Sequence, residues 1–340
     1  MRSDRALLVA AGGGIGDTLL ATVVARALRG TYARVDALVL PAHADVVARV
    51  AEIDRVFLVE DSALQIGRRM GRERFGAAVV TWATLFTAQI PFVARIPLRV
   101  GQARRLYSRL FTHRVVVRSE RGDHRSHWTQ ILLDYARAIG CDTADARPSI
   151  RPTADDERDA AALLRGHEIT GRFALLHPTR GLSAQRARWP IAGFTELAGA
   201  LTQRERLPLL VTGARDDAPI AQAIAAAAGR GARSIAGATS LGMYAALAQR
   251  ASFVVAMDSG PMHIAAAAGA PTVGIFALQS DEPDRWAPLG ARTAVVRATY
   301  PCPPDHRKET CPDFACVRAL DVAGILRAVD AVRIATSETT

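Results

Sequence analysis

The sequence predicts an α/β protein with two doubly wound parallel sheets, one in each of two domains. Short apolar runs alternate with longer segments of helical period along most of the chain, which is the βαβ pattern of a parallel sheet. A polar stretch with two prolines, 141–152, interrupts this alternation once, so it is the expected linker. The 340 residues also exceed what one hydrophobic core usually serves. We therefore expect domains at 1–150 and 151–334 and a frayed tail at 335–340.

The expected elements of the first domain follow in order from the N-terminus. Strands are expected at 6–11, 35–40 and 77–81, and helices at 18–29, 44–50 and 128–139. An arginine-rich stretch with one proline, 95–125, receives no assignment.

The second domain begins with a helix after residue 154, and the alternation then restarts. Strands are expected at 173–176, 208–211, 253–256 and 272–275, and helices at 191–203, 218–228, 241–249, from 260 onward, and at 322–334. Two successive α/β units of this kind predict two separate sheets.

Composition limits the partners. The formal charge of +10 favours anionic ligands, which include nucleic acid, a membrane surface and phosphorylated or carboxylated small molecules. The basic residues are almost all arginine, which suits bidentate binding of phosphate and carboxylate. Aromatic residues make up 6% of the chain and do not interleave with arginine, so nucleic acid is not an expected partner.

No segment predicts export or a membrane span. Arg2 and Arg5 precede an apolar stretch, but glycines and Asp17 interrupt it and no cleavage site follows. No other apolar run is long enough to cross a bilayer. The expected location is the cytoplasm, where the cysteines stay reduced.

A glycine-rich turn, Gly-Gly-Gly-Ile-Gly-Asp at 12–17, follows the first expected strand and opens the first expected helix. It does not fit the dinucleotide fingerprint GxGxxG. A start at Gly12 meets Asp17 where the last glycine belongs, and a start at Gly14 meets Leu19. A nicotinamide cofactor is therefore not expected.

Asp17 has two interpretations that the sequence leaves open. It is either a helix cap or a general base at the carboxyl end of a strand, where α/β sheets place their active sites. In both cases the helix N-terminus favours the charged carboxylate, which predicts a lowered pKa and a weak base.

A second turn, 257–263, precedes an alanine-rich helix. Pro261 marks a helix start, whose free N–H groups can bind a phosphate. Asp258 is then placed for a sugar or ribose hydroxyl, and His263 for a phosphate. The alternative is an ordinary capped helix with a hydrogen-bonded histidine.

A third group follows the strand at 173–176. Thr179 and Arg180, then Arg186 and Arg188, predict an anion-binding surface at the same edge of the second sheet.

The remaining motifs argue against metals and cofactors. Cys302, His306, Cys311 and Cys316 match no compact zinc pattern, so reduced thiols are expected and no metal is assigned. The chain has no Asp-x-Asp pair, Walker motif, HExxH or GxSxG sequence. No cofactor is expected.

The motifs together resemble the bacterial heptosyltransferases of glycosyltransferase family nine, over nearly the whole chain. The glycine-rich turn and the sequence Asp258-Ser259-Gly260-Pro261-Met262-His263 carry the resemblance, supported by His177-Pro178, Trp189-Pro190 and Arg285-Trp286. The family implies a GT-B fold, in which two Rossmann-like domains face a cleft. It also implies metal-independent, inverting transfer of a heptose from ADP-heptose to an acidic glycolipid, the inner core of lipopolysaccharide. Peripheral contact with the cytoplasmic face of the inner membrane is a further expectation.

The resemblance also assigns residue roles. Asp17 is the expected base. The expected donor ligands are Thr179, Arg186, Arg188, Asp217, Asp258, Ser259, Gly260 and His263. The expected acceptor-binding residues are Gly14, Gly16, Arg104, Arg105 and His127.

Two departures from the family pattern keep alternatives open. Ala187 stands where the family usually has a lysine, and Trp82-Ala83-Thr84 replaces a polar sequence that bears on the acceptor. The first alternative is a relative that moves another nucleotide-linked sugar, or uses a protein or small-molecule acceptor. The second is a non-catalytic carbohydrate-binding protein on the GT-B scaffold.

Overall fold

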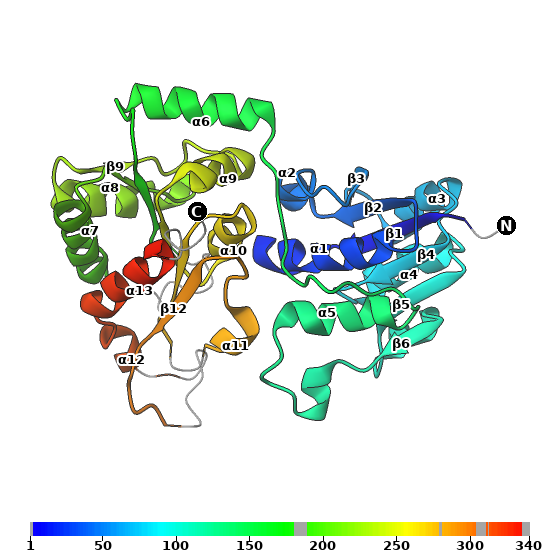
Figure 1. Ribbon diagram of the computed structural model, residues 1–340. Helices are drawn as coiled ribbons and strands as arrows, with labels where there is room; N and C mark the ends of the chain where they lie inside the picture. The colour runs from blue at the N-terminus through cyan, green and yellow to red at the C-terminus, as the bar shows by residue number, and fades with distance from the viewer. Residues whose placement is uncertain (1–2, 180–188, 279–280, 304–310, 312, 335–340) are drawn as a thin grey trace. The chain divides into compact units, whose positions relative to one another are not determined.

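The chain forms two compact units, Met1–Arg151 and Pro152–Thr340. The computed structural model describes residues 3–179, 189–278, 281–303, 311 and 313–334 (Figure 1).

The first unit is a six-stranded parallel sheet of strand order β3-β2-β1-β4-β5-β6. Its strands are β1 (Arg5–Ala10), β2 (Arg34–Val39), β3 (Arg55–Leu58), β4 (Ala77–Val80), β5 (Leu98–Gln102) and β6 (His113–Val115). The chain runs outward from β1 in one direction and from β4 in the other. The boundary between β1 and β4 is therefore the topological switch point, where open α/β sheets bind ligands.

Helices cover both faces of this sheet (Figure 1). They are α1 (Ile15–Arg29), α2 (Ala44–Val47), α3 (Ala63–Arg72), α4 (Leu85–Val93) and α5 (Trp128–Arg137), with short 3-10 helices η1 (Pro41–His43), η2 (Leu106–Leu110) and η3 (Arg118–Arg121). Leu7 and Val9 of β1 pack into one core with α3 and α4. Side chains alternate along a strand, so Leu8 points to the opposite face. The helices α1 and α5 pack against each other.

The second unit repeats this design with the strand order β12-β11-β10-β7-β8-β9, again all parallel. Its strands are β7 (Ala174–His177), β8 (Leu209–Val211), β9 (Ala232–Ser234), β10 (Val254–Met257), β11 (Thr272–Phe276) and β12 (Thr293–Arg297). Its helices are α6 (Ala154–Gly166), α7 (Ile191–Glu205), η5 (Arg215–Asp217), α8 (Ala218–Ala228), α9 (Leu241–Arg250), α10 (Gly260–Ala267), α11 (Pro283–Trp286), α12 (Ala315–Arg318) and α13 (Val322–Ile334). The switch point of this sheet lies between β7 and β10.

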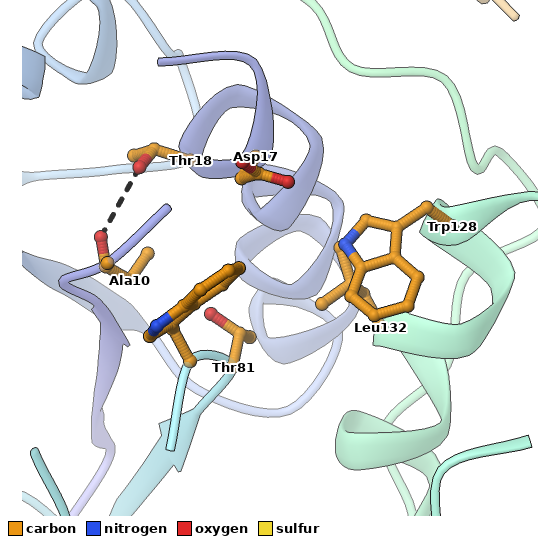
Figure 2. Close-up of a pocket in the computed structure, with 8 residues that line it drawn as sticks. Ala10, Asp17, Thr18, Thr81, Trp128 and Leu132 are labelled. Atoms are coloured by element: carbon orange, nitrogen blue, oxygen red, sulfur yellow. Dashed lines mark hydrogen bonds between the residues drawn. The ribbon is translucent and has the colours of Figure 1, made fainter. Parts of the chain in front are cut away.

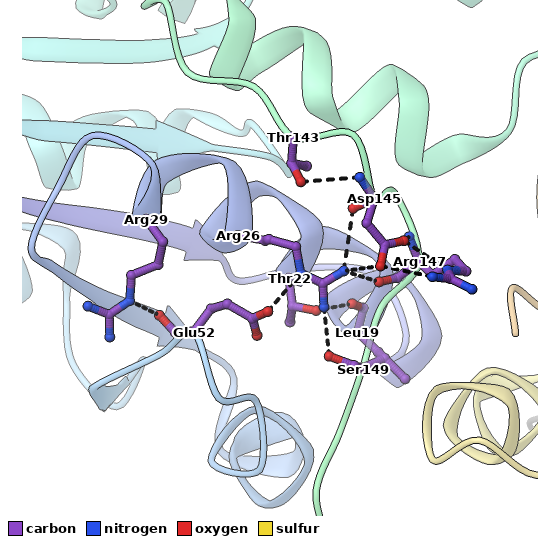
Figure 3. A network of polar contacts seen from close by, with 9 residues as sticks. All are labelled: Leu19, Thr22, Arg26, Arg29, Glu52, Thr143, Asp145, Arg147 and Ser149. Atoms are coloured by element: carbon purple, nitrogen blue, oxygen red, sulfur yellow. Dashed lines mark hydrogen bonds and ion pairs between the residues drawn. The ribbon is translucent and has the colours of Figure 1, made fainter.

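The segment expected to be a linker is tied to the first unit. Arg26 of α1 donates to the carbonyl of Arg147 at 2.6 Å and to Oγ of Ser149 at 2.7 Å, and it pairs with Glu52 at 2.7 Å (Figure 3). The Arg151 amide also bonds to the carbonyl of Arg49 at 2.8 Å. Residues up to Arg151 are therefore ordered along the first unit, although they lack helical or strand period.

The prediction of two doubly wound parallel sheets is confirmed. The unassigned stretch 95–125 holds β5, η2, β6 and η3, and α4 also went unpredicted. Pro91 lies inside α4, where sequence reasoning expects a break. An arginine and a glycine within Leu98–Gln102 interrupt the apolar pattern, so the sequence does not predict β5 either. The expected tail, 335–340, lies outside the described residues.

Candidate functional site

The turn after β1 positions Asp17. Gly13 has φ +69, a conformation that favours glycine, and a Cβ there would lie 2.7 Å from Oδ2 of Asp17. The amide of Gly14, the N-cap residue of α1, donates to the same Oδ2 at 2.8 Å. Asp17 is therefore a helix cap through one carboxylate oxygen. A carboxylate has two oxygens and about four lone-pair sites, so this bond does not occupy the whole group.

A small pocket at the switch point of the first sheet contains Asp17 (Figure 2). Its walls come from the ends of β1 and β4 and from α1 and α5. The lining residues are Ala10, Gly12, Asp17, Thr18, Thr81, Trp82, Trp128 and Leu132. A Cβ at Gly12 would lie 2.1 Å from Cδ1 of Trp82, so this glycine is needed for the indole to pack here. Trp82 remains 41% exposed, which leaves indole surface for a ligand.

Burial raises the pKa of Asp17, although the Gly14 N–H, the charge of His43 and the Asp17 N–H oppose that rise. The expected lowering by the helix N-terminus was therefore wrong in direction, because desolvation of the half-buried carboxylate outweighs it. A raised pKa makes the carboxylate a stronger base.

His43 is a buried neighbour of this site that sequence reasoning missed. Its Nδ1 lies 2.7 Å from Oγ1 of Thr18, the residue after Asp17. Burial lowers the pKa of His43, with the Asp17 charge opposing, so the ring is neutral at neutral pH. A histidine 26 residues from Asp17 in the sequence, in a segment with no motif, offers no signal of this contact.

The expected acceptor residues fall into two groups. Gly14 and Gly16 belong to the Asp17 turn itself, and His127 caps α5 by accepting from the amide of Thr129 at 3.2 Å, next to Trp128. Arg104 and Arg105 lie between β5 and η2, and both pair with Glu120, at 3.9 and 3.3 Å. No described contact joins either arginine to the lining of the Asp17 pocket.

In the second unit, a hydrogen-bonded chain links the ends of β7 and β8. Oγ1 of Thr179 donates to Oδ2 of Asp217 at 3.0 Å and lies 3.2 Å from Nε2 of His177. Nδ1 of His177 lies 2.9 Å from Oγ1 of Thr212. Because the one hydroxyl proton of Thr179 goes to Asp217, Nε2 of His177 carries the hydrogen in this chain. Burial lowers the pKa of His177 to about 4, so the ring stays neutral.

Asp217 repeats the capping arrangement of Asp17. The amide of Ala214 donates to Oδ2 of Asp217 at 2.9 Å, just as that of Gly14 does to Asp17. The sequence motif already included His177, but it gave no signal of the contacts of His177 with Thr212 and Tyr244. Tyr244 of α9 packs edge-on against His177 at 6.2 Å between ring centroids.

The N-terminus of α10 has no cap bond from its own N-cap side chain. Ser259 is the N-cap residue, but its hydroxyl donates to the carbonyl of Met257 at 3.0 Å and makes no cap bond. Pro261 has no N–H, and the Met262 N–H donates to the Ser259 carbonyl at 3.1 Å, so the Gly260 N–H is the first-turn donor that remains for an anion. His263 is buried, and Asp258 is half-buried with its amide bonded to the Ile275 carbonyl.

The two expected donor motifs converge at the switch point of the second sheet. β7 and β10 are paired neighbours, with Ala256 opposite His177. Parallel strands end at the same edge, so Thr179 and Asp258 follow adjacent strand ends. Arg186, Ala187 and Arg188 lie outside the described residues.

The cysteine cluster is also partly described. Cys302, Cys311 and Cys316 are free thiols. The pKa of Cys302 is raised by burial, then by the nearby Cys316 and Cys311. Among the described residues, no three His, Cys, Asp or Glu side chains are grouped to hold a metal, and His306 lies outside them. No described helix has the length and apolar character to cross a membrane.

The family model for glycosyltransferase family 9 (heptosyltransferase) matches residues 63–313. The chain belongs to this family. It is therefore a glycosyltransferase. The matched range includes the α10 turn, whereas Asp17 precedes it.

Other proteins are similar to this family 9 glycosyltransferase in sequence or structure over most of its length. It is 26% identical to lipopolysaccharide heptosyltransferase 2 of Salmonella typhimurium, over 83% of this chain and 85% of that protein. A family 9 glycosyl transferase from Veillonella parvula has a TM-score of 0.83 at 16% identity, covering 99% of both chains. The ADP-heptose LPS heptosyltransferase II of E. coli has a TM-score of 0.76 at 20% identity, covering 97% of this chain and 99% of that one. These likenesses confirm the expected GT-B fold.

Proposed function

We propose that this glycosyltransferase moves a heptose from ADP-heptose to the acidic inner core of lipopolysaccharide, with inversion and without a metal. The observation that carries the proposal is Asp17, a carboxylate of raised pKa in a pocket between Trp82 and Trp128. The similarity to an enzyme named for ADP-heptose and lipopolysaccharide supports the choice of donor and acceptor.

The second unit binds the donor in this proposal. The N-terminus of α10 and the arginines Arg186 and Arg188 stabilise the diphosphate as negative charge develops on the leaving ADP. Asp217 and Asp258 accept hydrogen bonds from ribose or heptose hydroxyls. The remaining donor contacts come from Thr179, Ser259, Gly260 and His263.

Asp17 acts on the acceptor. It takes the proton from the acceptor hydroxyl while that oxygen forms a bond to the anomeric carbon and the bond from this carbon to ADP breaks. Attack from the face opposite ADP inverts the anomeric centre. The free lone pairs of Asp17 receive the proton, and the Gly14 N–H holds the carboxylate in place. Gly14, Gly16, Arg104, Arg105 and His127 remain the proposed acceptor contacts.

Metal independence follows from the donor groups available. The chain has no Asp-x-Asp pair to hold a divalent ion on the diphosphate. A helix N-terminus and guanidinium groups supply positive charge without one.

The experiment tests the sugar and the acceptor separately. The acceptor is included because Trp82 replaces a polar family residue. The test combines the protein with ADP-heptose, other ADP-sugars and UDP-sugars, and measures which one raises the melting temperature. ADP-heptose should give the largest rise, and product should then form with a purified inner-core acceptor. A larger shift with another sugar would assign a different donor, and donor binding with no product on any acceptor would favour a carbohydrate-binding protein.

We place the enzyme in the cytoplasm, in peripheral contact with the inner membrane.

A further inference from the structure

The helix α4 presents an apolar face to water. Its nine residues, Leu85–Val93, include no charged side chain. Ala88 and Ile90 pack inward into the core of the first unit. Leu85 is 56% exposed and Phe92 is 50% exposed, and these positions seven residues apart lie on the same side of the helix. Gln89 is the one polar residue among the exposed positions of α4, and the other three are large apolar side chains. An outer side of this kind is normally covered, so the folding of this unit alone does not account for it.

The neighbouring η2 extends this face. Oη of Tyr107 donates to the carbonyl of Ala83 at 2.6 Å, which fixes η2 beside the turn that leads into α4. Leu106, the residue before Tyr107, is 88% exposed, the highest value among the large exposed apolar side chains described. We call Leu85, Phe86, Phe92 and Leu106 the α4–η2 surface.

The segment that carries the α4–η2 surface is rich in arginine. The 41 residues from 77 to 117 contain six arginines and no aspartate or glutamate. Arg95 and Arg109 are exposed, and neither pairs with an acidic side chain among the residues that the structure describes. Arg104 and Arg105 share the single carboxylate of Glu120. Exposed apolar side chains and an excess of arginine therefore occupy one region.

We propose that the α4–η2 surface docks on an anionic lipid bilayer. The apolar side chains enter the boundary between headgroups and acyl chains, and the arginines contact lipid phosphates. A second copy of this chain fits less well, because a two-fold interface here would oppose arginines to arginines. Nucleic acid would leave the apolar face in water.

This inference extends the proposed function, because a lipid-linked acceptor is held at such a bilayer. Trp82 connects the two regions. It lines the Asp17 pocket and lies three residues before α4, so docking places the pocket next to the lipid headgroups. An aromatic ring at the level of the lipid headgroups is typical of proteins that bind the membrane interface.

The test is sedimentation of the full chain with vesicles. The parent should bind vesicles of phosphatidylcholine mixed with phosphatidylglycerol, and binding should fall with added salt and be weak to phosphatidylcholine alone. The double variant Leu85→Ser/Leu106→Ser should lower the partition coefficient by about tenfold or more, because two exposed side chains lose their apolar contact. Ile191→Ser, an exposed apolar position on α7, is the matched control and should bind like the parent.

Three results would overturn the docking surface. The first is that the parent does not bind anionic vesicles. The second is that the double variant binds them as well as the parent does. The third is that the parent is a dimer and the double variant is a monomer.

Turnover measurements distinguish a failure of the docking surface from a failure of the proposed function. The double variant should keep parental turnover on a deacylated, water-soluble acceptor and lose rate only on the vesicle-embedded acceptor. Vesicle binding without any sugar transfer by the parent would keep the docking surface and refute the proposed reaction.

Discussion

Replacing Asp17 by asparagine separates its base role from its cap role. The asparagine side-chain oxygen can still accept the Gly14 N–H, whose bond to Asp17 is 2.8 Å long, so the turn should persist. The proton acceptor is lost. General-base catalysis contributes about 10²–10⁴-fold, so kcat should fall at least about a hundredfold, or about 2.7 kcal/mol of transition-state stabilisation. A steady-state assay of ADP release, with ADP affinity measured separately, gives both numbers.

The stability of the Asp17 variants should follow the raised pKa. A carboxyl group whose pKa is raised above 3.8 by folding stabilises the folded state only at low pH, and this contribution is lost as pH rises through the folded value. The asparagine side chain carries no charge to desolvate. At neutral pH the Asp17→Asn protein should therefore melt at or above the parental temperature. Asp17→Ala also removes the bond to Gly14 and should be less stable than Asp17→Asn by about 1 kcal/mol.

Asp156 provides a matched control, because it closes the capping box of α6 from the same helical position as Asp17 in α1. Asp156→Asn should leave kcat unchanged. In the parent, kcat should rise with pH through an apparent pKa above 3.8, and this acidic limb should disappear in Asp17→Asn. A folded Asp17→Asn protein with near-parental kcat would refute the base role and leave Asp17 as a cap only.

Three further outcomes are expected. Gly12→Ala places a methyl group 2.1 Å from Cδ1 of Trp82, so the indole should be displaced. The acceptor KM should then rise roughly tenfold in steady-state assays, while ADP affinity stays parental. An unchanged KM would show that Trp82 does not contact the acceptor. His263→Ala and Ser259→Ala should each weaken ADP binding, measured by calorimetry, by about 1–3 kcal/mol, and parental affinity in both folded variants would remove the α10 turn from the donor site. Excess EDTA should leave turnover unchanged, and a loss that magnesium restores would show that a metal takes part.

The sheet architecture was predictable because its central strands are continuous apolar runs. β10 and the part of β1 that follows Arg5 are buried on both faces and contain no polar residue, so both strands are recognisable in the sequence. The outer strands lack this signal. β6 has only three residues and its arginine is exposed, so its sequence resembles a loop.

The candidate site was predictable where a local pattern carries it. The glycines before Asp17 and the proline after Ser259 are local sequence signals that predict a turn at each position. The side chains that tune those turns come from distant segments. His43 and Trp82 reach Asp17 only through the order of β2, β1 and β4, and the burial that raises the pKa of Asp17 is a property of the assembled pocket.

All six strands of each sheet come from a single unit, and the two sheets share one strand order. Each half of the chain is therefore a complete module, with its own core and its own strand-end turns. Such modules can be recombined. A chimaera joined between Arg151 and Pro152 would combine the first half of one family 9 enzyme with the second half of another. If the proposed roles hold, its products should show the acceptor choice of the enzyme that supplied the first half and the nucleotide-sugar choice of the enzyme that supplied the second.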